Sequence, residues 1–238
     1  MRFVATFAIL TMCFALFSNF VSAQPELIIS RYIVNIELNN VGIVFINETW
    51  IFQNIGNETF SKNILVVKKG TLVKALSEPT LDLKVTLFQN DFILNFSLQS
   101  KPIKPKNQTI IKIFYIRDDL VIPVNFTYLF HFDVGDAPVP IYNIEIKIKL
   151  PYGFQAGSIE PTPYTRWMEK NRQIFYYFIQ HLAPTRMFGI EIKYGEFKQM
   201  SFEKITKVED ILKKANVTLN EAKELIIAYN LTSLKSDF

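Results

Sequence analysis

The chain has 238 residues, a formal net charge of +4, 49% hydrophobic residues and one cysteine. So small and scattered a positive charge excludes a nucleic-acid-binding surface. The single cysteine, Cys13, excludes an internal disulfide and a cysteine-ligated metal site.

The first 23 residues have the pattern of a signal peptide. Arg2 precedes an almost unbroken apolar run from Phe3 to Phe17, and Val21-Ser22-Ala23 is a small-x-small cleavage motif. We therefore predict cleavage before Gln24 and export of the chain. The alternative is a retained membrane anchor, because the apolar run approaches the roughly 20 residues that span a bilayer. A cysteine-free exported chain rich in Ile and Lys favours a prokaryotic, archaeal envelope.

From residue 26 to about 196, apolar and polar side chains alternate with a period of two, which is typical of half-buried β-strands. β-Branched and aromatic residues dominate these segments, and Asn-, Gly- and Pro-containing turns separate them. The pattern predicts strands at 28–38, 42–54, 62–67, 72–76, 81–88, 91–98, 109–116, 124–132, 141–150, 172–180 and 188–194.

About a dozen short strands, each with one polar face, predict a mainly β protein built as an antiparallel β-sandwich. We expect two tandem Ig-like sandwiches, formed by residues 24–118 and 119–200, with a single sandwich as the alternative. Residues 201–238 are predicted to form a C-terminal helical tail, in which Thr218 to Glu221 is a capping box. Such short helices are marginal alone, so their apolar stripe must pack on the sandwich or on a partner.

Asn-x-Ser/Thr sequons without proline at the middle position are unusually frequent in the chain. In an exported chain this excess predicts N-glycosylation. Asn95 and Asn125 fall on the more polar sides of their predicted strands. A glycan on either residue would therefore face solvent while the apolar side packs in the core. The predicted glycosylation sites are Asn47, Asn57, Asn95, Asn107, Asn125, Asn216 and Asn230.

Two stretches carry a resemblance to a known class of proteins. The segments 32–38, 41–44 and 47–52 resemble the opening strands of envelope proteins with a ribophorin-like or predicted-membrane-protein sandwich. Segment 138–149, followed by Leu150-Pro151-Tyr152-Gly153, is similar to the strand that begins their second sandwich. The resemblance covers the layout of about residues 28–195. It implies an extracytoplasmic sandwich and brings no catalytic residues.

No catalytic, cofactor or metal signature is visible in the sequence. His131 and His181 are far apart and no Gly-x-Ser-x-Gly motif accompanies them. We expect both histidines at the surface. The acid pairs at 118–119 and 133–136 fall in predicted loops, where acids usually form turns rather than a calcium loop or a catalytic pair. These observations predict a protein that is not an enzyme and has no metal or cofactor.

Tyr164 and Trp167 lie in a predicted Pro-flanked loop and are the candidate sugar-stacking residues. The chain is predicted to be a secreted or cell-surface glycoprotein that acts by protein–protein interaction in the cell envelope. Its expected partner is an envelope or surface protein, or a second copy, and it would touch a membrane only through an uncleaved signal segment. The alternatives are a carbohydrate-binding module and, less favoured, a secreted hydrolase.

Overall fold

The computed structural model describes residues 26–135 and 137–196, in which the chain is built from strands. No helix long and apolar enough to cross a membrane occurs among these residues. The predicted signal peptide, the predicted helical tail, Asn216 and Asn230 lie outside the described residues. The strands are β1 (Leu27–Leu38), β2 (Val44–Asn54), β3 (Ile64–Lys69), β4 (Thr71–Glu78), β5 (Asp82–Phe88), β6 (Asp91–Ser97), β7 (Gln108–Arg117), β8 (Val121–Val124), β9 (Thr127–Gly135), β10 (Ile141–Lys149), β11 (Phe154–Glu160), β12 (Thr165–Glu169), β13 (Arg172–Leu182) and β14 (Met187–Glu196).

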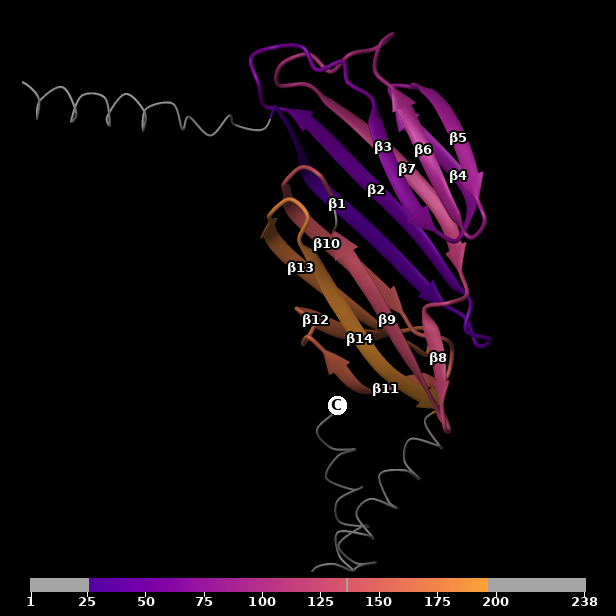
Figure 1. Cartoon of the computed structure of the whole chain (residues 1–238). Helices are drawn as coiled ribbons and strands as arrows, with labels where there is room; N and C mark the ends of the chain where they lie inside the picture. Colours follow the sequence, from indigo (N-terminus) through magenta and orange to yellow (C-terminus); the bar gives the residue numbers. More distant parts are fainter. Residues whose placement is uncertain (1–25, 136, 197–238) are drawn as a thin grey trace, which may run out of the picture.

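Seven strands form one large sheet in the order β12-β13-β10-β1-β2-β7-β4 (Figure 1). Its neighbours are antiparallel except for β1 and β10, which run parallel with Tyr32 opposite Ile144 and Ile36 opposite Ile148. The boundary predicted between residues 118 and 119 falls between β7 and β8, so strands from both sides of it share this sheet. The division into two sandwiches stays a prediction.

Two smaller antiparallel sheets cover one face of the large sheet (Figure 1). One has four strands in the order β11-β14-β9-β8, and the other has three in the order β3-β6-β5. The chain passes from the three-stranded sheet to the large one at Gly70, whose φ is +109°. A Cβ there would lie 2.3 Å from the carbonyl oxygen of Ile116, so this corner requires glycine. The predicted mainly β sandwich is confirmed.

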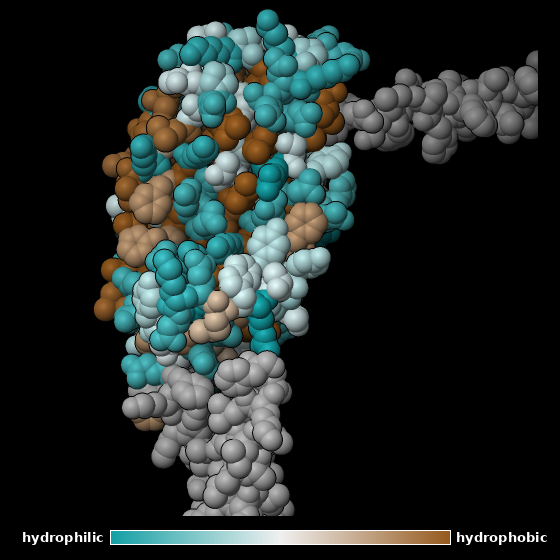
Figure 2. Space-filling view, turned by 180° about the vertical axis from the view of Figure 1, so that it is seen from behind, coloured by the Kyte–Doolittle hydropathy of each residue, from teal (hydrophilic) through white to brown (hydrophobic). Residues whose placement is uncertain are grey.

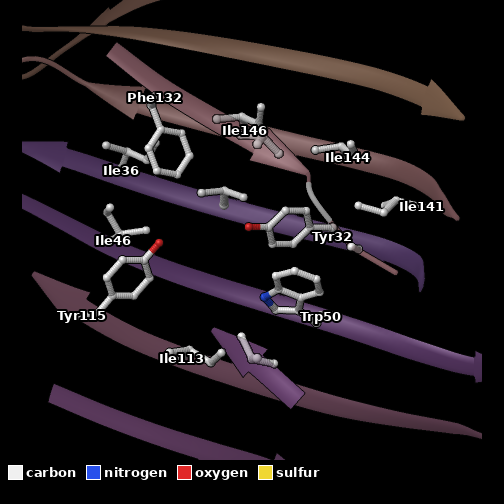
Figure 3. Close-up of a cluster of buried hydrophobic side chains, with 14 of the residues drawn as sticks. Tyr32, Ile36, Ile46, Trp50, Ile113, Tyr115, Phe132, Ile141, Ile144 and Ile146 are labelled. Atoms are coloured by element: carbon white, nitrogen blue, oxygen red, sulfur yellow. The ribbon is translucent and has the colours of Figure 1, made fainter. Parts of the chain in front are cut away.

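The core lies between the large sheet and its two covers. In β1, Tyr32, Val34 and Ile36 are fully buried, whereas the residues between them are partly or fully exposed, as the period of two predicts. Figure 3 shows buried side chains from β1, β2, β7, β9 and β10 meeting in one layer. Each large apolar side chain buried in this way contributes about 1.5–3 kcal/mol.

The structure corrects the predicted strand 124–132. β8 ends at Val124 and β9 begins at Thr127, and Asn125 adopts a φ of +55° in the tight turn between them. Thr127 is therefore buried, with its hydroxyl donating to the Val124 carbonyl at 2.9 Å, while Phe126 is 75% exposed. The two-residue turn interrupts the strand, so the alternation of sides does not continue through it from β8 to β9. The prediction of one continuous strand therefore assigned Thr127 to the wrong side.

β11 and β12 were not predicted from the sequence. Both lie at the edge of a sheet, and all five residues of β12 are exposed. A strand with little buried surface needs no apolar period, so periodicity could not reveal it. Trp167 consequently lies in a strand and not in the predicted loop.

Candidate functional site

A groove of about 770 Å³ separates the three-stranded sheet from the four-stranded sheet. Its floor is the large sheet, which contributes Leu27, Ile29, Trp50 and Phe52. Along one wall, every residue from Asn63 to Lys69 lines the groove, whereas β8, β9 and β14 contribute only some of their residues to the opposite wall. A concave space of this size, lined by both apolar and charged side chains, is typical of ligand-binding sites. The opposite wall includes Ile122, Leu129, His131, Asp133 and Glu191.

A buried carboxylate lies beside this floor, on the same face of the large sheet. Glu48 occupies an inward position of β2, between Ile46 and Trp50, and is fully buried. Its Oε1 accepts hydrogen bonds from Tyr115 Oη at 2.6 Å and from Lys68 Nζ at 3.0 Å. Its Oε2 accepts one from Trp50 Nε1 at 2.9 Å. Since an unpaired buried charge is strongly unfavourable, these three donors are what makes Glu48 tolerable here.

Lys68 reaches from β3 across to the large sheet. Its Nζ lies 5.0 Å from the Trp50 ring centroid and 3.4 Å from Tyr32 Oη, and its side chain is 18% exposed on the groove side. A cation over an aromatic face is favourable, especially where water is partly excluded. The ammonium has three N–H donors, and Glu48 and Tyr32 accept two of them within the described residues. The third can be donated to a ligand in the groove.

The two tyrosines beside Glu48 stay protonated. Burial, followed by the nearby negative charge of Glu48, raises the pKa of Tyr115 well above its ordinary value. The same two causes raise the pKa of Tyr32. Both hydroxyls therefore remain hydrogen-bond donors at neutral and mildly alkaline pH.

Glu48 and Lys68 were not among the residues selected from the sequence. The signal for Glu48 was present, because an acidic residue interrupts the inward-facing series Val44, Ile46, Glu48, Trp50, Phe52. An acid at a core position must have a partner. The identity of that partner could not be read from the sequence, since Lys68 belongs to a different sheet.

The opposite wall carries the histidine that was expected at the surface. The His131 side chain is 54% exposed, and its Nε2 lies 3.3 Å from Asp133 Oδ2. Glu191 stands opposite His131 on the neighbouring strand. Asp133, which was predicted to lie in a loop, is part of strand β9. In residues 26–135 and 137–196, no group of His, Cys, Asp and Glu is arranged to hold a metal ion.

Asp119, one residue of the other predicted acid pair, lines the groove. Arg117 donates two hydrogen bonds of 2.6 Å to Asp119, and these lower the pKa of the Asp119 carboxyl. A carboxylate engaged in this way by a neighbouring arginine has a structural role in the turn between β7 and β8.

Five of the predicted glycosylation sites lie in the described residues. Asn47, Asn57, Asn107 and Asn125 are exposed, whereas Asn95 is partly buried and its Oδ1 has no hydrogen-bond partner there. Asn47 lies on the uncovered face of the large sheet, because its neighbours in β2 point inward. Glycosylation at these positions stays a prediction.

The candidate sugar-stacking residues lie away from the groove. Tyr164 is 76% exposed and Trp167 is 38% exposed. Lys147 Nζ lies over the Trp167 ring, 5.3 Å from its centroid, and Tyr164 meets the Tyr176 ring edge-on. Tyr164 is therefore free to stack on a ligand, whereas one face of Trp167 already holds a cation.

No protein-family model and no curated protein matches this chain. A Legionella pneumophila protein described as nutrient-binding matches in structure with a TM-score of 0.50 and 9% identity, over 84% of this chain and 78% of that one. An M1 zinc metallopeptidase of Deinococcus radiodurans matches with a TM-score of 0.48 and 11% identity, over 71% and 42%. The yeast LTA4 hydrolase matches with a TM-score of 0.46 and 10% identity, over 72% and 29%. At these identities the matches concern the fold alone.

The peptidase matches correct one prediction. The chain was predicted not to be an enzyme, and this is contradicted by the finding that the solved structures it matches include M1 zinc metallopeptidases and LTA4 hydrolase. The lack of a catalytic motif in the sequence of this chain therefore does not exclude an enzyme. The chain spans less than half the length of those proteins, and the likeness assigns no catalytic residue to it. These matches do not bear on the ribophorin-like resemblance, which stays a prediction.

Proposed function

We propose that the chain is an exported, N-glycosylated β-sandwich protein that binds another polypeptide of the cell envelope in the groove between its two smaller sheets. The observation that carries this proposal is the groove itself, with an apolar floor and a wall formed by the whole length of β3. The signal-peptide pattern and the excess of sequons support the location.

The exposed surface of β3 supports a polypeptide as the ligand. Leu65 is 60% exposed and Val67 is 63% exposed, although both are large apolar residues on an edge strand. Unprotected apolar edges promote association, and natural proteins usually charge them, shorten them or cover them. A partner that covers β3 would bury Leu65 and Val67, which explains why large apolar residues occupy these exposed positions.

The predicted glycan at Asn47 disfavours the uncovered face of the large sheet as a binding surface. None of the five described sequon asparagines lines the groove. A glycan on Asn47 would instead stand on the uncovered face of the large sheet. Figure 2 shows this face from behind, with polar and apolar side chains intermixed. A glycan on Asn47 would therefore obstruct that face, whereas a glycan on Asn95, which stands opposite Leu65 in the register of β6 with β3, would border the groove.

Site-specific photocrosslinking in the producing cells tests the proposal. A photoreactive residue replaces Leu65 in one variant and Tyr152, which is 57% exposed and outside the groove, in the control. We expect one envelope polypeptide, identified by mass spectrometry, to crosslink at position 65 and not at position 152. Mass spectrometry of the same material should show an N-terminus at Gln24 and glycan masses on the sequons. A crosslink-free monomer released to the medium would contradict the proposal.

Carbohydrate binding is the second candidate, favoured by the exposure of Tyr164. If it is correct, Tyr164→Ala should abolish retention of the protein on envelope polysaccharide, and a photoreactive residue at position 65 should not affect retention. Equal retention of wild type and Tyr164→Ala would exclude this candidate.

A further inference from the structure

β3 is an edge strand whose backbone faces the groove. It ends the order β3-β6-β5, so only one of its two edges pairs with another described strand. Consecutive residues of a strand point to opposite faces of the sheet. Since residues 63 to 69 all line the groove without skipping alternate positions, the surface that they present is the edge of the strand.

The register shows which amides point into the groove. In an antiparallel pair, residues bonded to the partner strand alternate with residues whose N–H and C=O point away. The Gly70 N–H donates to the Asn90 carbonyl, and the register from Lys69–Asp91 to Ile64–Phe96 continues from this pair without a shift. Ile64, Val66 and Lys68 are therefore bonded to β6. The N–H groups of Leu65, Val67 and Lys69 point to the free edge.

The neighbouring edge of the groove is blunted, whereas β3 is not. β8 ends the four-stranded sheet and contains Pro123, which has no N–H to offer to a further strand. β3 contains no proline, and its six residues are mostly apolar. Of these two edges, β3 is the one on which a strand can be added.

We propose that the groove binds an extended peptide segment of the partner as an additional strand, hydrogen-bonded to the outward amides and carbonyls of β3. This inference rests on the proposed function and specifies its ligand. Such a strand lies above Trp50 and Phe52, so every second side chain of the ligand is apolar and faces the floor. The carboxylates of Asp133 and Glu191 on the opposite wall favour a Lys or Arg among the remaining side chains.

Peptide selection followed by hydrogen exchange tests this proposal. A phage-displayed library of short random peptides is selected on the purified mature chain, and the winning peptide is added to the protein. We expect exchange at Leu65, Val67 and Lys69 to slow by about tenfold or more, with no change at Ile64 and Val66, whose amides are already bonded. Protection confined to other strands, or no peptide that binds the groove, would overturn the proposal.

A backbone substitution provides the second test. Val67→Pro removes the middle of the three outward N–H groups, and because this amide does not bond to β6, the fold is retained. We expect peptide affinity to fall about tenfold, whereas the control Val67→Thr keeps the N–H and the wild-type affinity. Wild-type affinity in Val67→Pro would overturn strand addition. If the crosslink from position 65 nevertheless persists, the proposed function stands and only this inference fails.

Discussion

The two small sheets are attached to the large sheet by different chemistry. The three-stranded sheet is joined through the Lys68–Glu48 ion pair as well as through apolar contacts. The four-stranded sheet rests on a mostly apolar layer that includes Phe130, Ile190 and Ile192, and its Ala156 N–H donates to Gln173 Oε1 of the large sheet at 2.8 Å. Apolar burial contributes stability without direction, whereas a hydrogen-bonded ion pair fixes one position of one strand relative to another. The directional contact that carries charge is the one beside the groove.

Two buried tyrosines show the same contrast. Tyr115 donates its hydroxyl hydrogen to Glu48, whereas the Tyr177 hydroxyl has no partner among the described residues. A hydrogen-bonded polar group in a core contributes a modest stabilisation, about 1.5–3 kcal/mol for a bond to a charged group, whereas an unsatisfied one is unfavourable. The Tyr115 hydroxyl is therefore expected to stabilise the fold, and the Tyr177 hydroxyl to destabilise it.

The largest effect is expected for Glu48→Ala. It leaves the Lys68 ammonium and the Tyr115 hydroxyl without their acceptor, so the free energy of unfolding should fall by about 3–5 kcal/mol in chemical denaturation. The double variant Glu48→Gln with Lys68→Met removes both charges and keeps an acceptor for Tyr115. It should recover at least half of the loss, and failure to do so would show that the pair is not what attaches β3.

Tyr115→Phe should have a smaller effect of the same sign. It removes one donor from a buried carboxylate and leaves the aromatic packing in place. We expect a loss of about 1–3 kcal/mol of unfolding free energy, measured by urea denaturation. A neutral result would mean that Lys68 and Trp50 alone satisfy Glu48.

Tyr177→Phe should instead be neutral or stabilising, by up to about 1 kcal/mol, because it removes a buried hydroxyl without a partner. Burial raises the pKa of Tyr177 to about 12, above the value near 10 of an unfolded chain. The unfolded state therefore ionises first, and wild-type stability is lost as the pH rises from about 10 through about 12. The variant's advantage should widen over that interval in thermal melts. Destabilisation at neutral pH would point to a hydrogen bond that this hydroxyl makes.

The smallest effect is expected for Asp119→Asn. Arg117 lowers the pKa of Asp119 in the folded state, so the pair contributes stability above the unfolded pKa of about 4, and this contribution is lost as the pH falls through the folded value. The Asp119 side chain is 55% exposed, so screening limits the effect to about 0.5 kcal/mol or less. Wild type and variant should converge in unfolding free energy as the pH falls through the folded pKa of Asp119 and its carboxyl becomes neutral.

Much of the fold was accessible from the sequence, and little of the candidate site was. The alternation in 28–38 and 141–150 predicted β1 and β10 within a residue or two. The alternation could not predict that β1 and β10 pair in parallel, because the apolar pattern of a strand does not specify which strand lies next to it. The hairpin at Asn125 was not predicted because a tight turn interrupts an apparently continuous apolar alternation. The edge strand β12 was not predicted because it has no buried face.

The sequence by itself determined, for the strands with one buried face, which residues are extended and which side is apolar, because the period of two is a property of the backbone. Only the tertiary structure decided which strands are neighbours, because that depends on hydrogen bonds and packing between distant segments. Tyr32, Glu48, Lys68 and Tyr115 come from four strands in two sheets and become one cluster only when those sheets are stacked. The groove and its open β3 edge arise at the same step.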